Sequence, residues 1–199
     1  MPLKLGPITL PFGKSEHDPY WERFLKTVPH DKRNAMTEML QQSPEGVVAP
    51  VKSELHSPEI TSTHIKELAL YVGSDLTGVA RRPAGAEYPF AVVCVVKAEH
   101  DPREAPGIGG QVPVMNGQFS TFVLAAYIRE LGYRATTAGN PDPDAERLAA
   151  AAGLGRLNAQ GRLVTGKFGD RVHVAEIINT DLPLEPDGEL LPSPSTGEG

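Results

Sequence analysis

The sequence is poor in cysteine, since its 199 residues include only Cys94. A single thiol forms no internal disulfide and cannot supply the several thiolates of a zinc or iron–sulfur site. Cys94 lies inside the apolar run 90–96, where a small buried thiol is commoner than a reactive one. The six histidines are scattered and none pairs at metal-ligand spacing. We therefore predict no protein metal ligands and no iron–sulfur cluster.

Long apolar runs and basic clusters are also missing. No segment approaches the roughly 20 apolar residues of a membrane span, and the N-terminus lacks the continuous apolar stretch of a secretory signal. The net charge is −6 and no stretch is rich in Lys and Arg, which disfavours binding to a phosphate backbone. We expect no nucleic-acid partner, no membrane insertion and a cytoplasmic location. The G-x-S-x-G, P-loop and H-E-x-x-H motifs are absent too.

Proline and glycine are abundant, at 19 and 20 residues, which predicts long loops. The chain is long enough for one domain with a core of its own. Three parts are expected: an N-terminal helical and loop extension (1–60), a core domain (61–184) and a disordered tail (185–199).

The extension contains two segments predicted as helices: DKRNAMTEMLQQ, with Asp31 as its N-cap, and SEHDPYWERFLKTVP, whose apolar residues recur at helical spacing. These residues are Tyr20, Trp21, Phe24, Leu25 and Val28.

Within the core, helix and strand patterns follow one another in an irregular order. The predicted elements are helices at 63–74, 115–133 and 142–155, strands at 75–83, 87–98 and 133–140, and a hairpin formed by 161–169 and 170–180 with its turn near Phe168–Asp170. The run 87–98 is apolar throughout, which is typical of a central strand covered on both faces. Because the order is not a regular βαβ alternation, it indicates an α+β sandwich with a mostly antiparallel sheet.

Several local features refine this outline. Thr61 or Ser62 is the expected N-cap of the first helix. Residues 101–114, with the glycine-rich GIGG at 107–110, are interpreted as a loop. Asp142 and Asp144 are interpreted as caps of the following helix. The helix 115–133 is expected to pack on the sheet through an apolar stripe formed by Phe119, Phe122, Val123, Ala126, Tyr127 and Leu131.

From about Ile65 onward, four segments resemble, in order and spacing, the corrinoid-binding core of the reductive dehalogenases and the related epoxyqueuosine reductases. They read GSDLTGVARRP, YPFAVVCVVK, NGQFSTFVLAAYIRELGYRATTAGN and AAAGLGRLNAQGRLVTGKFGDRVHVAEIINTDLPL. The last is the most specific, with a glycine-rich helix end, an LVT strand, a K-F-G turn, an R-V-H strand and a closing T-D-L-P-L. The resemblance implies a nitroreductase-like fold, with cobalamin held base-off and no protein histidine on cobalt.

The sequence departs from the family pattern at two points. In the family, T-D-L-P-L is followed by a cysteine-rich ferredoxin-like module, whereas EPDGELLPSPSTGEG follows here. Electrons are therefore expected to come from a separate redox partner. The family also carries a tyrosine proton donor in a G-Y-S context. The resemblance places Phe119 at this point, and a phenyl ring has no proton to give.

The resemblance also implies candidate site residues. Candidate catalytic residues are Asn140, Arg171 and His173; the last two fall where the family has a basic residue beside the tyrosine, and which of them matches stays open. A flat macrocycle needs an apolar floor and a polar rim, which small polar and glycine-rich stretches would provide. The candidate cofactor-binding residues are Gly117, Gln118, Phe119, Ser120, Thr137, Ala138, Gly139, Gly155, Arg156, Leu157 and Thr165.

The predicted function is cobalamin binding, either by a cobalamin carrier or processing protein or by a corrinoid-dependent reductase with an external electron donor. Two alternatives stay open, namely a non-catalytic interaction domain with a closed pocket and a flavin-binding nitroreductase-like enzyme. Neither catalysis nor a homodimer is decided by the sequence, because fold does not fix function.

Overall fold

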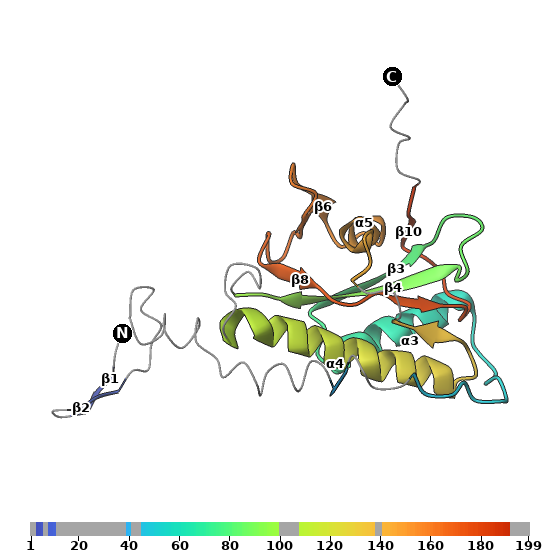
Figure 1. Ribbon diagram of the computed structural model, residues 1–199, viewed down its shortest axis with the longest axis horizontal. Helices are drawn as coiled ribbons and strands as arrows, with labels where there is room; N and C mark the ends of the chain where they lie inside the picture. The colour runs from blue at the N-terminus through green and yellow to red at the C-terminus, as the bar shows by residue number, and fades with distance from the viewer. Residues whose placement is uncertain are drawn as a thin grey trace, which may run out of the picture.

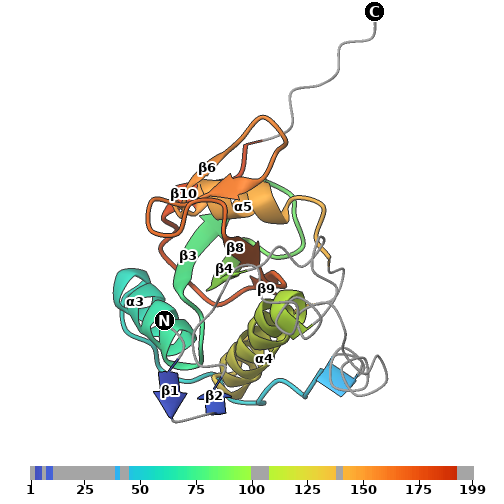
Figure 2. The ribbon, with the colours of Figure 1, turned by 90° about the vertical axis from the view of Figure 1, so that its left-hand side faces the viewer.

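The computed structural model describes residues 3–5, 8–10, 39–40, 45–99, 108–137 and 141–191. The described residues form a six-stranded sheet that lies between two layers of helices (Figure 1). Helices α3 (Pro58–Tyr71) and α4 (Ile108–Glu130) cover one face, and α5 (Ala145–Ala151) covers the other. Figure 2 shows the same layers from the side. The α+β class and the flanking helices are confirmed.

The sheet is mixed but mostly antiparallel. Its strands are β3 (Leu76–Arg81), β4 (Phe90–Lys97), β5 (Ala135–Thr136), β8 (Val172–Val174), β9 (Ile178–Thr180) and β10 (Gly188–Glu189). The order is β10-β3-β4-β9-β5, with β8 also on β4, and only β10 runs parallel to its neighbour. Two small pairs complete the described strands: β1 (Leu3–Leu5) with β2 (Ile8–Leu10), and β6 (Arg156–Leu157) with β7 (Leu163–Val164).

Strand β4 is the centre of the core, as its sequence predicts. Alternate side chains, including Val92 and Cys94, pack toward α3 and α4, while the intervening ones, including Val93 and Val95, pack toward α5. The two-sided covering explains the uninterrupted apolar run. Cys94 is fully buried.

Burial raises the pKa of the Cys94 thiol, and the neighbouring hydroxyls of Ser74 and Thr77 only partly oppose this shift. The thiol is therefore protonated and shielded, which agrees with the interpretation of Cys94 as a core residue.

Helix α3 begins earlier than predicted. Ser57 is the N-cap and its hydroxyl accepts a hydrogen bond from the backbone N–H of Ile60 at 3.4 Å. The assignment of Thr61 or Ser62 as the cap was wrong, because both are buried inside the helix. Proline at the first helical position is the signal that marks the true start, since its missing N–H is not needed there.

Helix α4 also begins earlier, at Ile108. The loop predicted for 101–114 is therefore wrong for residues 108–114, and residues 101–107 lie outside the described ranges. Pro113 lies inside the helix. In a helix interior Gly costs about 1 kcal/mol and Pro about 3 kcal/mol relative to Ala, and packing against the rest of the domain overrides this cost in α4.

The buried face of α4 differs from the predicted one. The side chains packed in the core are Leu124, Ala125 and Ile128, whereas Phe119 and Tyr127 are 53% and 43% exposed. Phe119 and Tyr127 of the predicted stripe therefore point outward, whereas Leu131 packs against the core. A helix that is apolar on both sides gives no periodicity signal to tell which side meets the sheet.

The hairpin predicted for 161–180 does not form. Strand β7 pairs with β6, and β8 and β9 pair with β4 instead. The chain turns between Thr165 and Gly169, which exchange two backbone hydrogen bonds. A β-branched run predicts a strand but not its partner, because the partner depends on contacts far along the chain.

The tail predicted for 185–199 is wrong as far as residue 191. Strand β10 pairs with β3, and Leu190 is buried. The carboxylate of Asp187 accepts the backbone N–H of Val79 at 2.8 Å and pairs with Lys66 at 2.7 Å. Residues 192–199 lie outside the described part of the chain.

Candidate functional site

A β-bulge interrupts the strand segment 172–180 where it crosses β4. Val174 pairs with Val95 and Ile178 pairs with Val92, which leaves residues 175–177 opposite only two residues of β4. One extra residue bends the strand and reorients its side chains, and such bulges are over-represented beside active sites.

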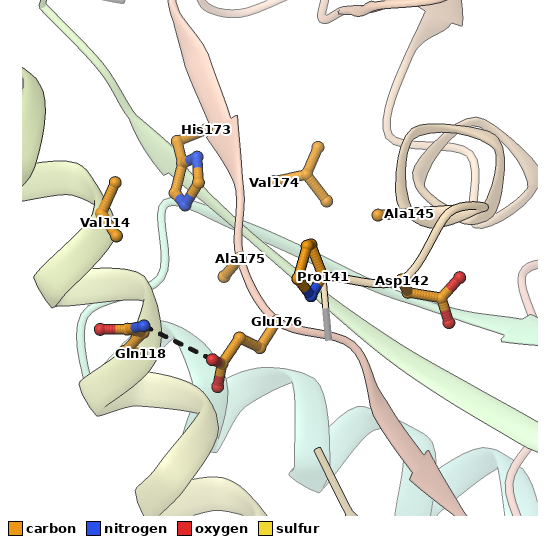
Figure 3. A pocket seen from close by; sticks show the side chains of 9 residues that line it. All are labelled: Val114, Gln118, Pro141, Asp142, Ala145, His173, Val174, Ala175 and Glu176. Carbon is orange, nitrogen blue, oxygen red and sulfur yellow. Dashed lines mark hydrogen bonds between the residues drawn. The ribbon is translucent and has the colours of Figure 1, made fainter. Parts of the chain in front are cut away.

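A cavity of about 250 Å³ lies beside this bulge (Figure 3). Its wall is formed by the first half of α4, by the bulged segment and by the chain that leads into α5. The lining residues are Val114, Gln118, Pro141, Asp142, Ala145, His173, Val174, Ala175 and Glu176. The wall is thus mainly apolar, with an amide, an imidazole and two carboxylates set into it.

Gln118 connects α4 to the bulge. Its Nε2 donates to Oε1 of Glu176 at 3.4 Å (Figure 3), and the residue is only 5% exposed. Its own Oε1 is buried and has no hydrogen-bond partner in the described part of the chain. Leaving a buried acceptor unpaired costs about 1–3 kcal/mol. Figure 3 shows this oxygen on the side of the amide away from Glu176.

Gly117 sets the distance between α4 and the bulge. A Cβ added to it would lie 2.8 Å from Cβ of Ala175 and 3.6 Å from Cδ2 of His173. Any larger residue would push the helix away from the strand. Gly117 thus affects the cavity through backbone packing.

Asp142 is held in the wall by a mostly buried ion pair. Nη2 of Arg82 pairs with Oδ2 of Asp142, and these side chains are 14% and 12% exposed. Nε and Nη2 of Arg82 also donate to Oδ1 of Asn179 at 3.0 and 2.7 Å. One guanidinium therefore ties the segment before α5 to strand β9.

The capping interpretation is wrong for Asp144. It occupies the N-cap position of α5, but its side chain makes no capping hydrogen bond and pairs with Arg147 at 2.5 Å. The Oδ1 of Asp142 instead accepts the backbone N–H of Asp144 at 2.8 Å, which forms a side-chain turn before the helix.

The candidate catalytic residues separate in the structure. His173 lines the cavity and points away from Val172, which packs on the α5 side, as the strand alternation predicts. Arg171 is exposed and is not among the lining residues. His173 is thus the member of the pair that faces the cavity, while Asn140 lies outside the described residues.

The residues predicted to bind cofactor on α4 point in different directions. Gln118 faces the cavity, whereas Phe119, about 100° further around the helix, faces outward. The Ser120 hydroxyl donates to the backbone carbonyls of Val72 and Asn116 at 3.0 and 2.9 Å, which ties α4 to the end of α3.

The remaining predicted residues are not brought to this cavity. Gly155, Arg156 and Leu157 belong to the β6 region, in the layer that contains α5 (Figure 1). The Thr165 hydroxyl supports its own turn, donating to the Gly169 carbonyl at 3.2 Å. Thr137 is partly buried and does not line the cavity; Ala138 and Gly139 lie outside the described ranges.

Sequence reasoning missed Val114, Asp142 and Glu176 as wall residues. A signal for Glu176 was available, because two consecutive buried isoleucines follow it and break the strict alternation of a strand. Among the described residues, no group of three or more His, Cys, Asp or Glu is placed to hold a metal ion, and none of the helices has the length and apolar character of a membrane span.

Comparison with known proteins relates about half of the sequence to the reductive dehalogenases. The tetrachloroethene reductive dehalogenase of Desulfitobacterium hafniense is 32% identical over 109 residues, or 52% of this chain and 20% of the relative. The enzyme of the same name from Dehalobacter restrictus matches over the same shares. The chain thus spans about a fifth of the length of these relatives. No family model matches it.

Solved structures show the same fold over most of the chain. The catabolic reductive dehalogenase NpRdhA matches with a TM-score of 0.64 and 23% identity, covering 88% of this chain and 26% of that one. A reductive dehalogenase structure described in terms of B12-dependent dehalogenation matches with a TM-score of 0.61 and 23% identity, covering 83% and 25%.

The chain is therefore a reductive dehalogenase-like domain of α+β fold. Its partial homology is to the tetrachloroethene reductive dehalogenases. The resemblance to reductive dehalogenases predicted from the four sequence segments is confirmed.

Proposed function

We propose that this domain binds a corrinoid, with one edge of the macrocycle against the wall beside the bulge. The observation that carries the proposal is a mainly apolar cavity whose wall contains Gln118, with a buried Oε1 that lacks a hydrogen-bond partner among the described residues. The rim of a corrin ring carries carboxamides, whose N–H groups are donors of the kind this oxygen lacks. The likeness to a structure described in terms of B12-dependent dehalogenation supports the same cofactor class.

The described residues fit one edge of a corrinoid and not the entire group. The cavity of about 250 Å³ is smaller than the roughly 300–1,000 Å³ of pockets that enclose drug-sized ligands, and a corrinoid is larger than such ligands. Val114, Ala145 and Val174 supply apolar contact, and Gln118 supplies the acceptor. The rest of the macrocycle would extend beyond this wall.

Three of the four polar side chains of the wall have a defined role in this proposal. Glu176 orients the Gln118 amide, so that Oε1 is left to accept from the ligand. Arg82 fixes the position of Asp142, and with it the wall on the α5 side. We assign no protein ligand to cobalt, in keeping with a base-off corrinoid. The bound corrinoid would supply the cobalt redox chemistry.

Two physiological roles follow from this binding step. One is cobalamin carriage or processing, which requires only reversible binding. The other is corrinoid-dependent reduction, which needs electrons from a separate redox partner.

The proposal is tested by mixing the purified protein with hydroxocobalamin and separating them by gel filtration. Cobalamin absorbance is expected to co-elute with the protein. Gln118→Leu is expected to weaken binding about five-fold, because a neutral hydrogen bond contributes about 1 kcal/mol. The matched control is Gln160→Leu, since Gln160 is exposed and does not line the cavity. A folded protein that elutes colourless at all cobalamin concentrations would exclude the proposal.

The small cavity volume favours a second candidate function, a non-catalytic interaction domain with a closed pocket. This candidate predicts a folded protein that binds no cobalamin. In that case Gln118→Leu should change the stability of the domain little, because removal of the buried unpaired oxygen offsets the loss of the hydrogen bond to Glu176.

A further inference from the structure

The outward face of α4 is mainly apolar, and between residues 119 and 127 it carries no exposed polar side chain, whereas Asn116 and Glu130 are exposed at either end of that stretch. We call it the α4 outer face and define it by Val112, Phe119, Val123, Ala126 and Tyr127. Three of these are large side chains that are at least 40% exposed, and the other two are partly buried. A helix with one free side normally turns polar residues to it. Contiguous exposed apolar surface of this kind marks a contact site.

We propose that the α4 outer face is covered by an N-terminal segment of the same chain, residues 15–28, folded as an amphipathic helix. This inference does not depend on corrinoid binding. It concerns residues outside the described ranges, and it rests on the path of the described chain, on its reach and on the chemistry of the segment.

The chain that follows this segment lies beside the C-terminal end of α4 from residue 45 onward. The backbone N–H of Ala49 donates to the Arg129 carbonyl at 2.9 Å, and that of Ser53 donates to the Leu131 carbonyl at 2.9 Å. Glu45 accepts a hydrogen bond from the hydroxyl of Thr136. The described range 45–99 therefore begins, at Glu45, beside the C-terminal end of α4.

The intervening chain is long enough to place the segment anywhere along the helix. Residues 29–44 would span about 55 Å when extended. Helix α4 has 23 residues and is therefore about 35 Å long. The tether imposes no strain on docking.

The chemistry of the segment complements the α4 outer face. Its apolar residues, including Trp21, Phe24 and Val28, recur at three- and four-residue steps, so one side of the predicted helix is a large apolar stripe. Two such stripes bury each other in ordinary helix packing. The tether also keeps the segment at an effective concentration in the millimolar range, which favours it over a second copy of the chain.

The test uses Trp21, which is the single tryptophan of the sequence. Its emission is expected to be blue-shifted in the native protein, with an acrylamide quenching constant several-fold lower than in urea. Tyr127→Glu should raise quenching toward the urea value. The matched control, Tyr71→Glu on α3, changes a side chain that is 88% exposed and should leave quenching unchanged.

A second variant distinguishes loss of docking from a folding defect in α4. Phe24→Glu alters only the segment, so the core should keep its circular dichroism while Trp21 loses its protection. Quenching of native Trp21 at the urea value would overturn the proposal, as would full protection in both Tyr127→Glu and Phe24→Glu. Protection that disappears on dilution, together with dissociation of a dimer in sedimentation, would assign the face to a second copy instead.

Discussion

Arg82→Met is expected to destabilise the domain by about 3 kcal/mol, because it leaves the mostly buried carboxylate of Asp142 without its cation. The same change removes both donors to Oδ1 of Asn179. The loss should appear as a lower urea midpoint with an unchanged m-value. Because Asp142 lines the cavity, we also expect weaker cobalamin binding.

The double variant Arg82→Met with Asp142→Asn separates the ion pair from general packing. It should lose less stability than the sum of the two single variants, because no buried charge is left unpaired. Arg134→Met, which breaks the more exposed pair with Asp181, should have a much smaller effect. Strict additivity of the two single losses would show that Arg82 acts on Asp142 only through its volume.

Gly188→Val is expected to detach β10 from the sheet. A Cβ at this position would overlap the carbonyl oxygen of Ala151 in α5, and overpacking of this kind costs about 1–3 kcal/mol. Loss of β10 would also expose Leu190 and the ion pair between Asp187 and Lys66. We expect a lower melting temperature and rapid proteolysis between residues 185 and 191.

The matched control for this prediction is Gly166→Val. An added Cβ there meets no atom within 4 Å, so the same change of residue type should leave stability and proteolysis close to those of the parent. Equal protease resistance of Gly188→Val and the parent protein would show that β10 contributes little to the fold.

The parts of the fold that follow from local chemistry were predictable. Strand β4 was recognised as central because a β-branched run without polar breaks suits burial on both faces. Helices α3, α4 and α5 each end two residues before a glycine with a positive φ, namely Gly73, Gly132 and Gly153, and glycine tolerates this conformation best.

The predictions that were wrong concern features that depend on packing between residues far apart in the sequence. Helix α4 is apolar on both sides, so its periodicity could not tell the core from the outer face. The tail was taken as disordered from its composition, although Asp187 and Leu190 anchor it to elements more than 100 residues away in sequence. Strand pairing failed at 161–180 for the same reason.

The candidate site was predictable only in part. The resemblance pointed to Gln118 and His173, and the structure places both in one wall. The resemblance alone could not tell whether Arg171 or His173 faces the cavity, because this depends on the register of the strand on β4. Glu176 was missed because a bulge, not the regular alternation, brings it to the cavity.

The position of cobalt relative to Gln118 tests corrinoid binding most directly. Crystals of the protein grown with hydroxocobalamin should give an anomalous cobalt peak on the cavity side of Gln118 and His173, with a corrin carboxamide donating to Oε1 of Gln118. A cobalt peak elsewhere on the domain, or crystals without cobalt beside a fully ordered and closed wall, would contradict the account.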